Sequence, residues 1–248
     1  MQPKITIESA NQERITNADA NPALTRIQLW DLPIRIFHWS LAIAVITAFV
    51  TAWIGGSLME AHGKAGLAIV GLVVFRLVWG FIGSTHARFV NFAPSPSRLR
   101  EYLQGRWRGV GHNPLGAFSI FALLSLLLLQ TATGLFANDD IDFTGPLYAL
   151  VEETLSDRLT GIHHLLSNFL LGLVALHVLA IIFYVRVKKD DLVKPMLTGW
   201  KEVRSDAESS KGRLGALVAA LLIALAVVYG VSGAGMSETP PVNNAPGW

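Results

Sequence analysis

The stretch HHLLSNFLLGLVALH, from His163 to His177, decides the fold. It is almost wholly apolar, which predicts a helix inside a membrane, and its end histidines are fourteen residues apart. On a helix their side chains point within roughly 40° of each other and lie roughly 21 Å apart along the axis. They cannot share one metal, but they can give one ligand to each of two stacked haems.

The composition places the chain in a membrane. Of its 248 residues 52% are hydrophobic and 15% are charged, with a mean hydropathy of +0.44, which is too apolar for an ordinary soluble domain. The sequence has no cysteine, which excludes covalently attached c-type haem, cysteine-ligated iron–sulfur clusters and disulfides. Residues 1–30 are polar and show no apolar core with a cleavage site, so we expect no cleaved signal peptide.

Five apolar segments are long enough to span a bilayer, at about 34–54, 63–82, 115–136, 161–185 and 214–231. We therefore predict an all-α membrane protein with five transmembrane helices. The expected divisions are a polar tail (1–29), a two-haem domain (30–200), a linker (201–213), the extra helix (214–232) and a second polar tail (233–248).

Charge in the loops predicts the orientation. The loop at about 84–113 contains five arginines, and the segment after residue 185 is also basic, whereas the loop at about 137–160 carries six carboxylates. Basic loops face the cytoplasm, so we expect the N-terminus and linker inside and the C-terminus outside. The acidic loop either helps to dock a partner or merely follows the charge rule for outer loops.

Four histidines match in depth as two pairs. His38 and His177 lie near the cytoplasmic ends of their segments, and His62 and His163 near the outer ends. A histidine in a membrane helix can be a packing residue, but ionisable groups at this depth are costly and usually functional. Two imidazoles would fill both axial positions of a haem iron, which favours electron transfer over oxygen binding.

Three further histidines offer alternatives. His164 adjoins His163 but points about 100° away, so it is a less suitable ligand at the outer position. His86 and His112 lie near segment ends in the basic loop, and we expect them to be interfacial residues.

Arg76 is the remaining conspicuous residue. It follows His62 by fourteen residues, so it shares that helix face at the depth of the inner histidine pair. A charge at this depth needs a partner, and a haem propionate would serve. The alternative is that the side chain extends to the inner headgroups.

Several segments together carry a family resemblance: Trp30–Trp39 (WDLPIRIFHW), Arg76–Gly80 (RLVWG), His86–Phe89 (HARF), His112–Gly116 (HNPLG) and the His163–His177 helix. Over about residues 27–200 the chain resembles the bacterial cytochrome b561 group, which includes the b-type cytochrome subunit of membrane-bound nickel–iron hydrogenases. The resemblance implies a four-helix haem-binding transmembrane bundle with two b haems, and the fifth C-terminal transmembrane helix is a departure from the family pattern. It also implies axial ligands from the first, second and fourth helices. These ligands correspond to His38, His62, His163 and His177.

The function expected from this resemblance is a bacterial inner-membrane cytochrome b with two haems. It would transfer electrons between a quinone pool and a redox partner, such as a hydrogenase or a multihaem c-type cytochrome. We expect an electron-transfer subunit rather than a stand-alone enzyme, and no nucleic-acid partner. The alternatives are a self-contained quinol oxidase acting on oxygen or superoxide, and a haem-free anchor or transporter.

Overall fold

Five long helices dominate the computed structural model, which describes residues 25–107, 109, 111–203 and 212–235. Each is long and apolar enough to cross a membrane, as the sequence predicts. They are α2 (Leu32–Ile54), α3 (Met59–Ile82), α6 (Pro114–Gly134), α7 (Glu153–Phe183) and α9 (Leu214–Val231). The two expected polar tails and the expected linker lie largely outside the described residues, so most of these divisions stay predictions.

Side-chain caps fix where two of these helices begin. Asp31 Oδ1 accepts the backbone N–H of Ile34 at 2.9 Å before α2, and Asn113 Oδ1 accepts that of Gly116 at 2.7 Å before α6. Both caps are followed by proline in the first turn. α7 has no such cap and begins at Glu153 rather than at about 161, because polar turns precede its apolar stretch.

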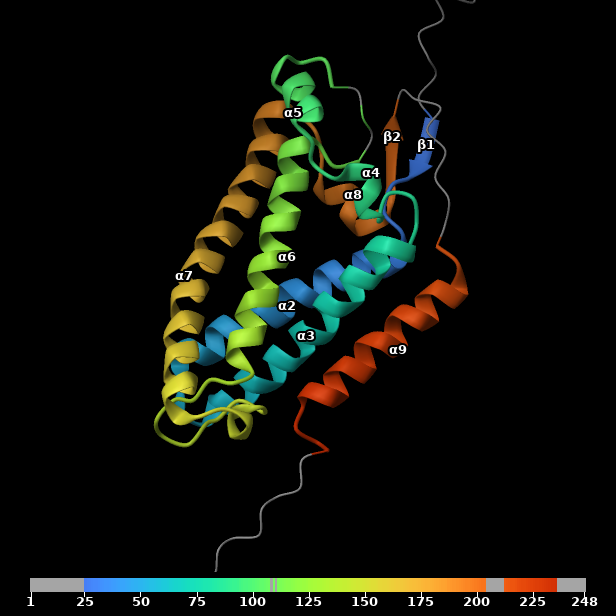
Figure 1. Cartoon of the computed structure of the whole chain (residues 1–248). Helices are drawn as coiled ribbons and strands as arrows, with labels where there is room; N and C mark the ends of the chain where they lie inside the picture. The colour runs from blue at the N-terminus through green and yellow to red at the C-terminus, as the bar shows by residue number, and fades with distance from the viewer. Residues whose placement is uncertain (1–24, 108, 110, 204–211, 236–248) are drawn as a thin grey trace, which may run out of the picture.

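The helices pack as two neighbouring pairs with one addition (Figure 1). α2 packs on α3 and α6 on α7, while α3 also contacts α6 and α9. Small residues bring α9 close to α3: Ala220 and Ala224 are buried, and a Cβ on Gly71 would lie 3.0 Å from Val228. The fifth helix is therefore a packed part of the molecule, beside the second span.

The molecule has two chemically distinct ends. The end where α2 begins and α3 and α7 finish is called here the basic end, and the end carrying residues 137–152 is the acidic end. At the acidic end the connections include short 3-10 helices at Gly56–Leu58 and Tyr148–Leu150.

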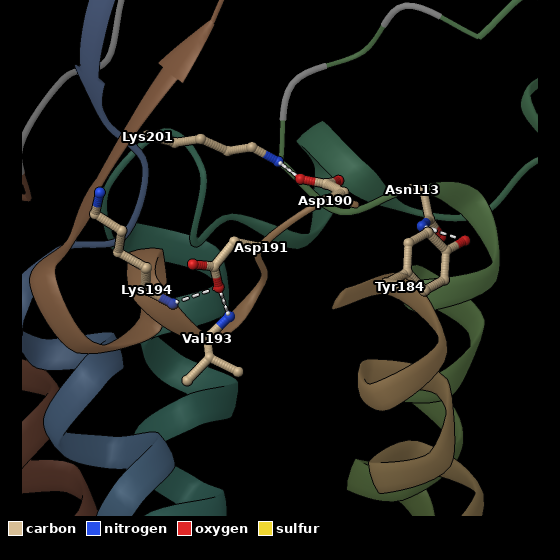
Figure 2. Close-up of polar contacts among 7 residues, drawn as sticks. All are labelled: Asn113, Tyr184, Asp190, Asp191, Val193, Lys194 and Lys201. Carbon is tan, nitrogen blue, oxygen red and sulfur yellow. Dashed lines mark hydrogen bonds and ion pairs between the residues drawn. The ribbon is translucent and has the colours of Figure 1, made fainter. Parts of the chain in front are cut away.

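At the basic end the polar loop is partly helical, with α4 (Phe89–Phe92) and α5 (Pro96–Leu103). The Tyr102 hydroxyl is hydrogen-bonded to the Tyr184 hydroxyl. The Tyr184 hydroxyl also accepts the side-chain amide N–H of Asn113 at 2.8 Å (Figure 2). Tyr184 begins a π-helical turn, Tyr184–Lys188, that ends α7. These bonds fasten the loop and the start of α6 to the end of α7.

A two-stranded sheet at the basic end is a departure from the all-α expectation. β1 (Thr25–Gln28) pairs antiparallel with β2 (Trp200–Val203), which follows the short helix α8 (Val193–Thr198). Asp191 accepts the backbone N–H groups of Val193 and Lys194 at 3.0 Å, and Lys201 pairs with Asp190 at 2.8 Å (Figure 2). The sheet thus joins the chain before α2 to the chain after α7.

The core at this end is centred on Trp79, which is 1% exposed. Its indole N–H donates to Asp31 Oδ2 at 3.1 Å, and its ring stacks on Phe75. Asp31 therefore caps α2 and also fastens it to α3.

Candidate functional site

His62 of α3 and His163 of α7 meet at the acidic end. Their ring centroids are 6.1 Å apart and the rings are nearly perpendicular. His62 Nδ1 donates to the backbone oxygen of Ala48 at 2.9 Å, and His163 Nδ1 donates to that of Gln130 at 2.9 Å. These bonds place the single ring proton on Nδ1 and leave a lone pair on each Nε2, the form in which a neutral imidazole binds a metal.

Glycines provide room around this pair. A Cβ on Gly134 would lie 2.8 Å from Cε1 and 3.1 Å from Nδ1 of His163, so a side chain there would displace the ring. A Cβ on Gly63 would lie 3.0 Å from the Phe143 ring. Phe143 belongs to the acidic-end connection, which therefore packs against α3 at Gly63, the residue that follows His62.

The acidic-end connection is an ordered turn. Asp139 Oδ1 accepts the backbone N–H groups of Ile141, Asp142 and Phe143 at 2.8–3.0 Å. These bonds, the one from Phe143 first, lower the pKa of Asp139. Asp139 is thus a structural residue of the turn, whereas Asp140 and Asp142 are exposed.

His38 of α2 and His177 of α7 both lie at the basic end, near enough that a charge on one would act on the other, and His177 is near His112 in the same sense. The His38 ring contacts Trp39 edge-on at 5.2 Å. His38 Nδ1 is buried and has no hydrogen-bond partner among the described residues. The structure therefore brings His62 and His163 into ring contact and places His38 and His177 at the same end of the bundle, whereas His164 is exposed.

Arg76 is enclosed by protein at the basic end. It is 4% exposed, and its guanidinium lies over Phe89 at 4.5 Å and near Phe92 at 5.9 Å from the ring centroids. Its Nη1 is buried without a hydrogen-bond partner among the described residues. The side chain therefore does not extend to the molecular surface, and its unpaired donor suits a carboxylate.

His112 is a residue whose position the sequence did not reveal. It lies just before the start of α6, at a span end as expected, and its ring packs between Trp30 at 4.5 Å and Phe92 at 4.6 Å. Burial, and then the nearby charge of Arg76, hold its pKa well below the ordinary value for histidine. The signal that could have located it is its place directly before Asn113, the cap of α6.

Gln130 of α6 is a second residue that sequence reasoning missed. Its side-chain amide nitrogen lies 3.0 Å from His163 Nε2, and its Oε1 is buried without a hydrogen-bond partner among the described residues. The available signal was a lone amide near the end of a long apolar segment, where polar groups need partners.

The donor set fits b haem. In the described part of the chain no three His, Asp or Glu side chains gather around a point where they could hold a bare metal ion. An iron in a porphyrin needs only two axial ligands, and each histidine pair offers two imidazoles from different helices. The buried, unpaired Arg76 donor supplies a partner for a propionate at the basic end.

Comparison with known proteins decides the family. The family model described as prokaryotic cytochrome b561 matches residues 29–199. The chain belongs to this family. It is therefore an integral membrane b-type cytochrome with haem b as its cofactor, and the expectation from the sequence motifs is confirmed.

Curated relatives of this cytochrome b561 chain carry a common name. A protein of Rhizobium leguminosarum bv. viciae is 25% identical over 70% of this chain and 87% of its own length. A protein of Azotobacter vinelandii is 24% identical over 73% of this chain and 91% of its own length. Both are named probable Ni/Fe-hydrogenase B-type cytochrome subunit. No solved structure matches the chain significantly.

Proposed function

We propose that the protein binds two b haems and transfers electrons across the membrane between a quinone pool and a redox partner protein. His62 and His163 would be the axial ligands of one haem, and His38 and His177 those of the other. The observation that carries this proposal is the ring contact of His62 with His163 at one end of the bundle, together with the placement of His38 and His177 at the other end. Each bound haem would supply a one-electron Fe(III)/Fe(II) couple.

The residues around the acidic-end pair support a ligand role. The backbone oxygens of Ala48 and Gln130 hold the two rings through Nδ1. Such outer contacts orient a metal-binding imidazole and raise its basicity. If two imidazoles bound a haem iron, no position on it would be left for a substrate, which suits electron transfer.

At the basic end Arg76 would hold a haem propionate. Its guanidinium is fixed over Phe89, and Nη1 is free to donate. A buried positive charge also favours the reduced state of a nearby haem, because oxidation adds a positive charge. Arg76 would therefore raise the midpoint potential of the basic-end haem.

The redox partner that the relatives favour is a hydrogenase. Their shared name places them with nickel–iron hydrogenases, and a c-type cytochrome is the other candidate. By the charge rule the basic end faces the cytoplasm of a bacterial inner membrane, so the acidic end and the C-terminus face the periplasm. A partner would then exchange electrons at the acidic end, beside His62 and His163.

The haem assignment is tested by haem content and potentiometric titration of the purified full-length protein. We expect about two b haems per chain, and we expect His38→Ala and His62→Ala each to lose one haem and to retain different potentials. His164→Ala, in which an exposed histidine is removed, should keep both components. A ratio near one haem per chain, or the same surviving potential in both variants, would contradict the assignment.

A further inference from the structure

Asp31 and Arg76 are the two buried charged side chains in the described part of the chain, and both lie at the basic end. Asp31 is 8% exposed and Arg76 is 4% exposed. The Arg76 guanidinium lies over the Phe89 ring, whereas both oxygens of Asp31 accept hydrogen bonds from other groups. The two charges are nevertheless near enough to act on each other. Protein therefore encloses one positive and one negative charge at the end of the bundle that carries His38.

Two hydrogen bonds fix the position of the Asp31 carboxylate. Its Oδ1 accepts the backbone N–H of Ile34 at 2.9 Å, and its Oδ2 accepts the indole N–H of Trp79 at 3.1 Å. An ionised carboxylate accepts both bonds well, and the N-terminus of α2 is a favourable place for a negative charge. The charge thus has a fixed position relative to α2 and α3.

The indole that holds Asp31 is covered by protein. Its ring stacks on Phe75, with the centroids 6.0 Å apart. A Cβ on Gly212, in the chain before α9, would collide with Cη2 and Cζ2 of Trp79, so the backbone there lies against the ring. A charge acts more strongly in such a low-dielectric environment than in water. Asp31 can therefore act over a distance at which an exposed carboxylate would be screened.

We propose that Asp31 opposes Arg76 in setting the midpoint potential of the basic-end haem. Asp31 and His38 are seven residues apart, so they lie on one face of α2, about 10 Å apart along its axis. A fixed negative charge favours the oxidised haem, because oxidation adds a positive charge, and it therefore lowers the potential. Arg76 acts in the opposite sense, so the potential reflects the balance of the two charges. This inference rests on the proposed binding of a haem by His38 and His177.

Potentiometric titration of the full-length protein in detergent tests the proposal. Asp31→Asn and Asp31→Ser both remove the charge and keep a side chain that can cap α2. We expect each to raise the midpoint potential of the component that depends on His38. A unit charge at about 15 Å in an effective dielectric of about 20 corresponds to a roughly 6-fold larger ratio of reduced to oxidised haem at a fixed ambient potential. The component that depends on His62 should stay near its wild-type potential.

Asp191→Asn is the matched control. Asp191 also accepts backbone N–H groups at the basic end, but it is exposed, so its charge is screened and its removal should leave both potentials unchanged. Trp79→Phe separates the charge of Asp31 from its structural role. It removes the indole donor and keeps the carboxylate and an aromatic ring, so we expect lower thermal stability without a rise in potential.

The outcomes separate this proposal from the haem assignment. An unchanged or lower potential in a folded Asp31 variant overturns the proposal, and so does an equal rise in Trp79→Phe, which would assign the effect to the lost bond. Loss of the His38-dependent component from both Asp31 variants also overturns it, because Asp31 would then maintain the site rather than set its potential. If His38→Ala keeps both components, the haem assignment itself fails.

Discussion

Replacing Gly134 with alanine should weaken the acidic-end haem site. The added Cβ would lie 2.8 Å from His163 Cε1, whereas carbon atoms in contact prefer about 3.5–4.0 Å, so the ring must retreat by roughly 0.7 Å. A shift of that size directed away from α6 would lengthen the 2.9 Å bond from His163 Nδ1 to the Gln130 backbone oxygen to about 3.6 Å, which is beyond hydrogen-bond range. A free ring can rotate away from the methyl group, but an iron-bound ring cannot, so the strain opposes haem binding.

The size of the effect follows from overpacking, which typically costs about 1–3 kcal/mol, or roughly 5- to 150-fold in affinity. Haem content by pyridine haemochromogen and a potentiometric titration would show loss of the component that depends on His62. Gly172→Ala is the matched control, because a Cβ at that position on α7 meets no atom within 4 Å. If Gly134→Ala retains both components in the wild-type ratio, the acidic-end pair is not where haem binds.

Two other substitutions test the basic end and the acidic turn. Arg76→Leu should lower the midpoint potential of the haem that depends on His38 by tens of millivolts, since a unit charge at about 10 Å in an effective dielectric of about 20 is worth about 1.7 kcal/mol. In a redox titration Arg76→Lys, which keeps the charge, should stay closer to wild type. A shift only in the other haem would contradict the placement of Arg76. Asp139→Ala should speed amide hydrogen exchange at 141–143, while Asp142→Ala should not. Folding lowers the Asp139 pKa below its reference value of 3.8, so the ionised carboxylate stabilises the turn fully above about pH 4. This stabilisation is lost as pH falls through the folded pKa, and the difference in hydrogen exchange between wild type and Asp139→Ala should vanish in acid.

The spanning helices were predictable because membrane depth dictates their length and composition. α9 begins at the expected residue and α2 within two residues, since an apolar block of fixed length leaves little choice. Matching histidine depths likewise predicted which side chains would meet, because a helix converts sequence distance into depth. The early start of α7 was missed because its first turns are polar.

The remaining features depend on contacts between distant segments. β1 and β2 are four residues each, too short for a sequence pattern to reveal, and pair only because the folded bundle brings their flanks together. Gln130 and His112 were missed for a related reason, because their surroundings come from other elements of the fold. Gln130 contacts His163. His112 packs on Trp30 and Phe92 and lies near Arg76. Periodicity identifies the face of a helix but not the atom that a side chain reaches.

The pairing of β1 with β2 determines when the chain before α2 can fold during synthesis. Thr25 pairs with Val203, so the strand before the first span must wait for nearly the whole four-helix unit to leave the ribosome. At about 5–20 residues per second this delay is on the order of 10–35 s. During that time the start of α2 can be held by Asp31 and Trp79, but not by the sheet. The chain that follows the fourth span thus fastens the chain before the first span, and this pairing becomes possible only after α2 to α7 have been made.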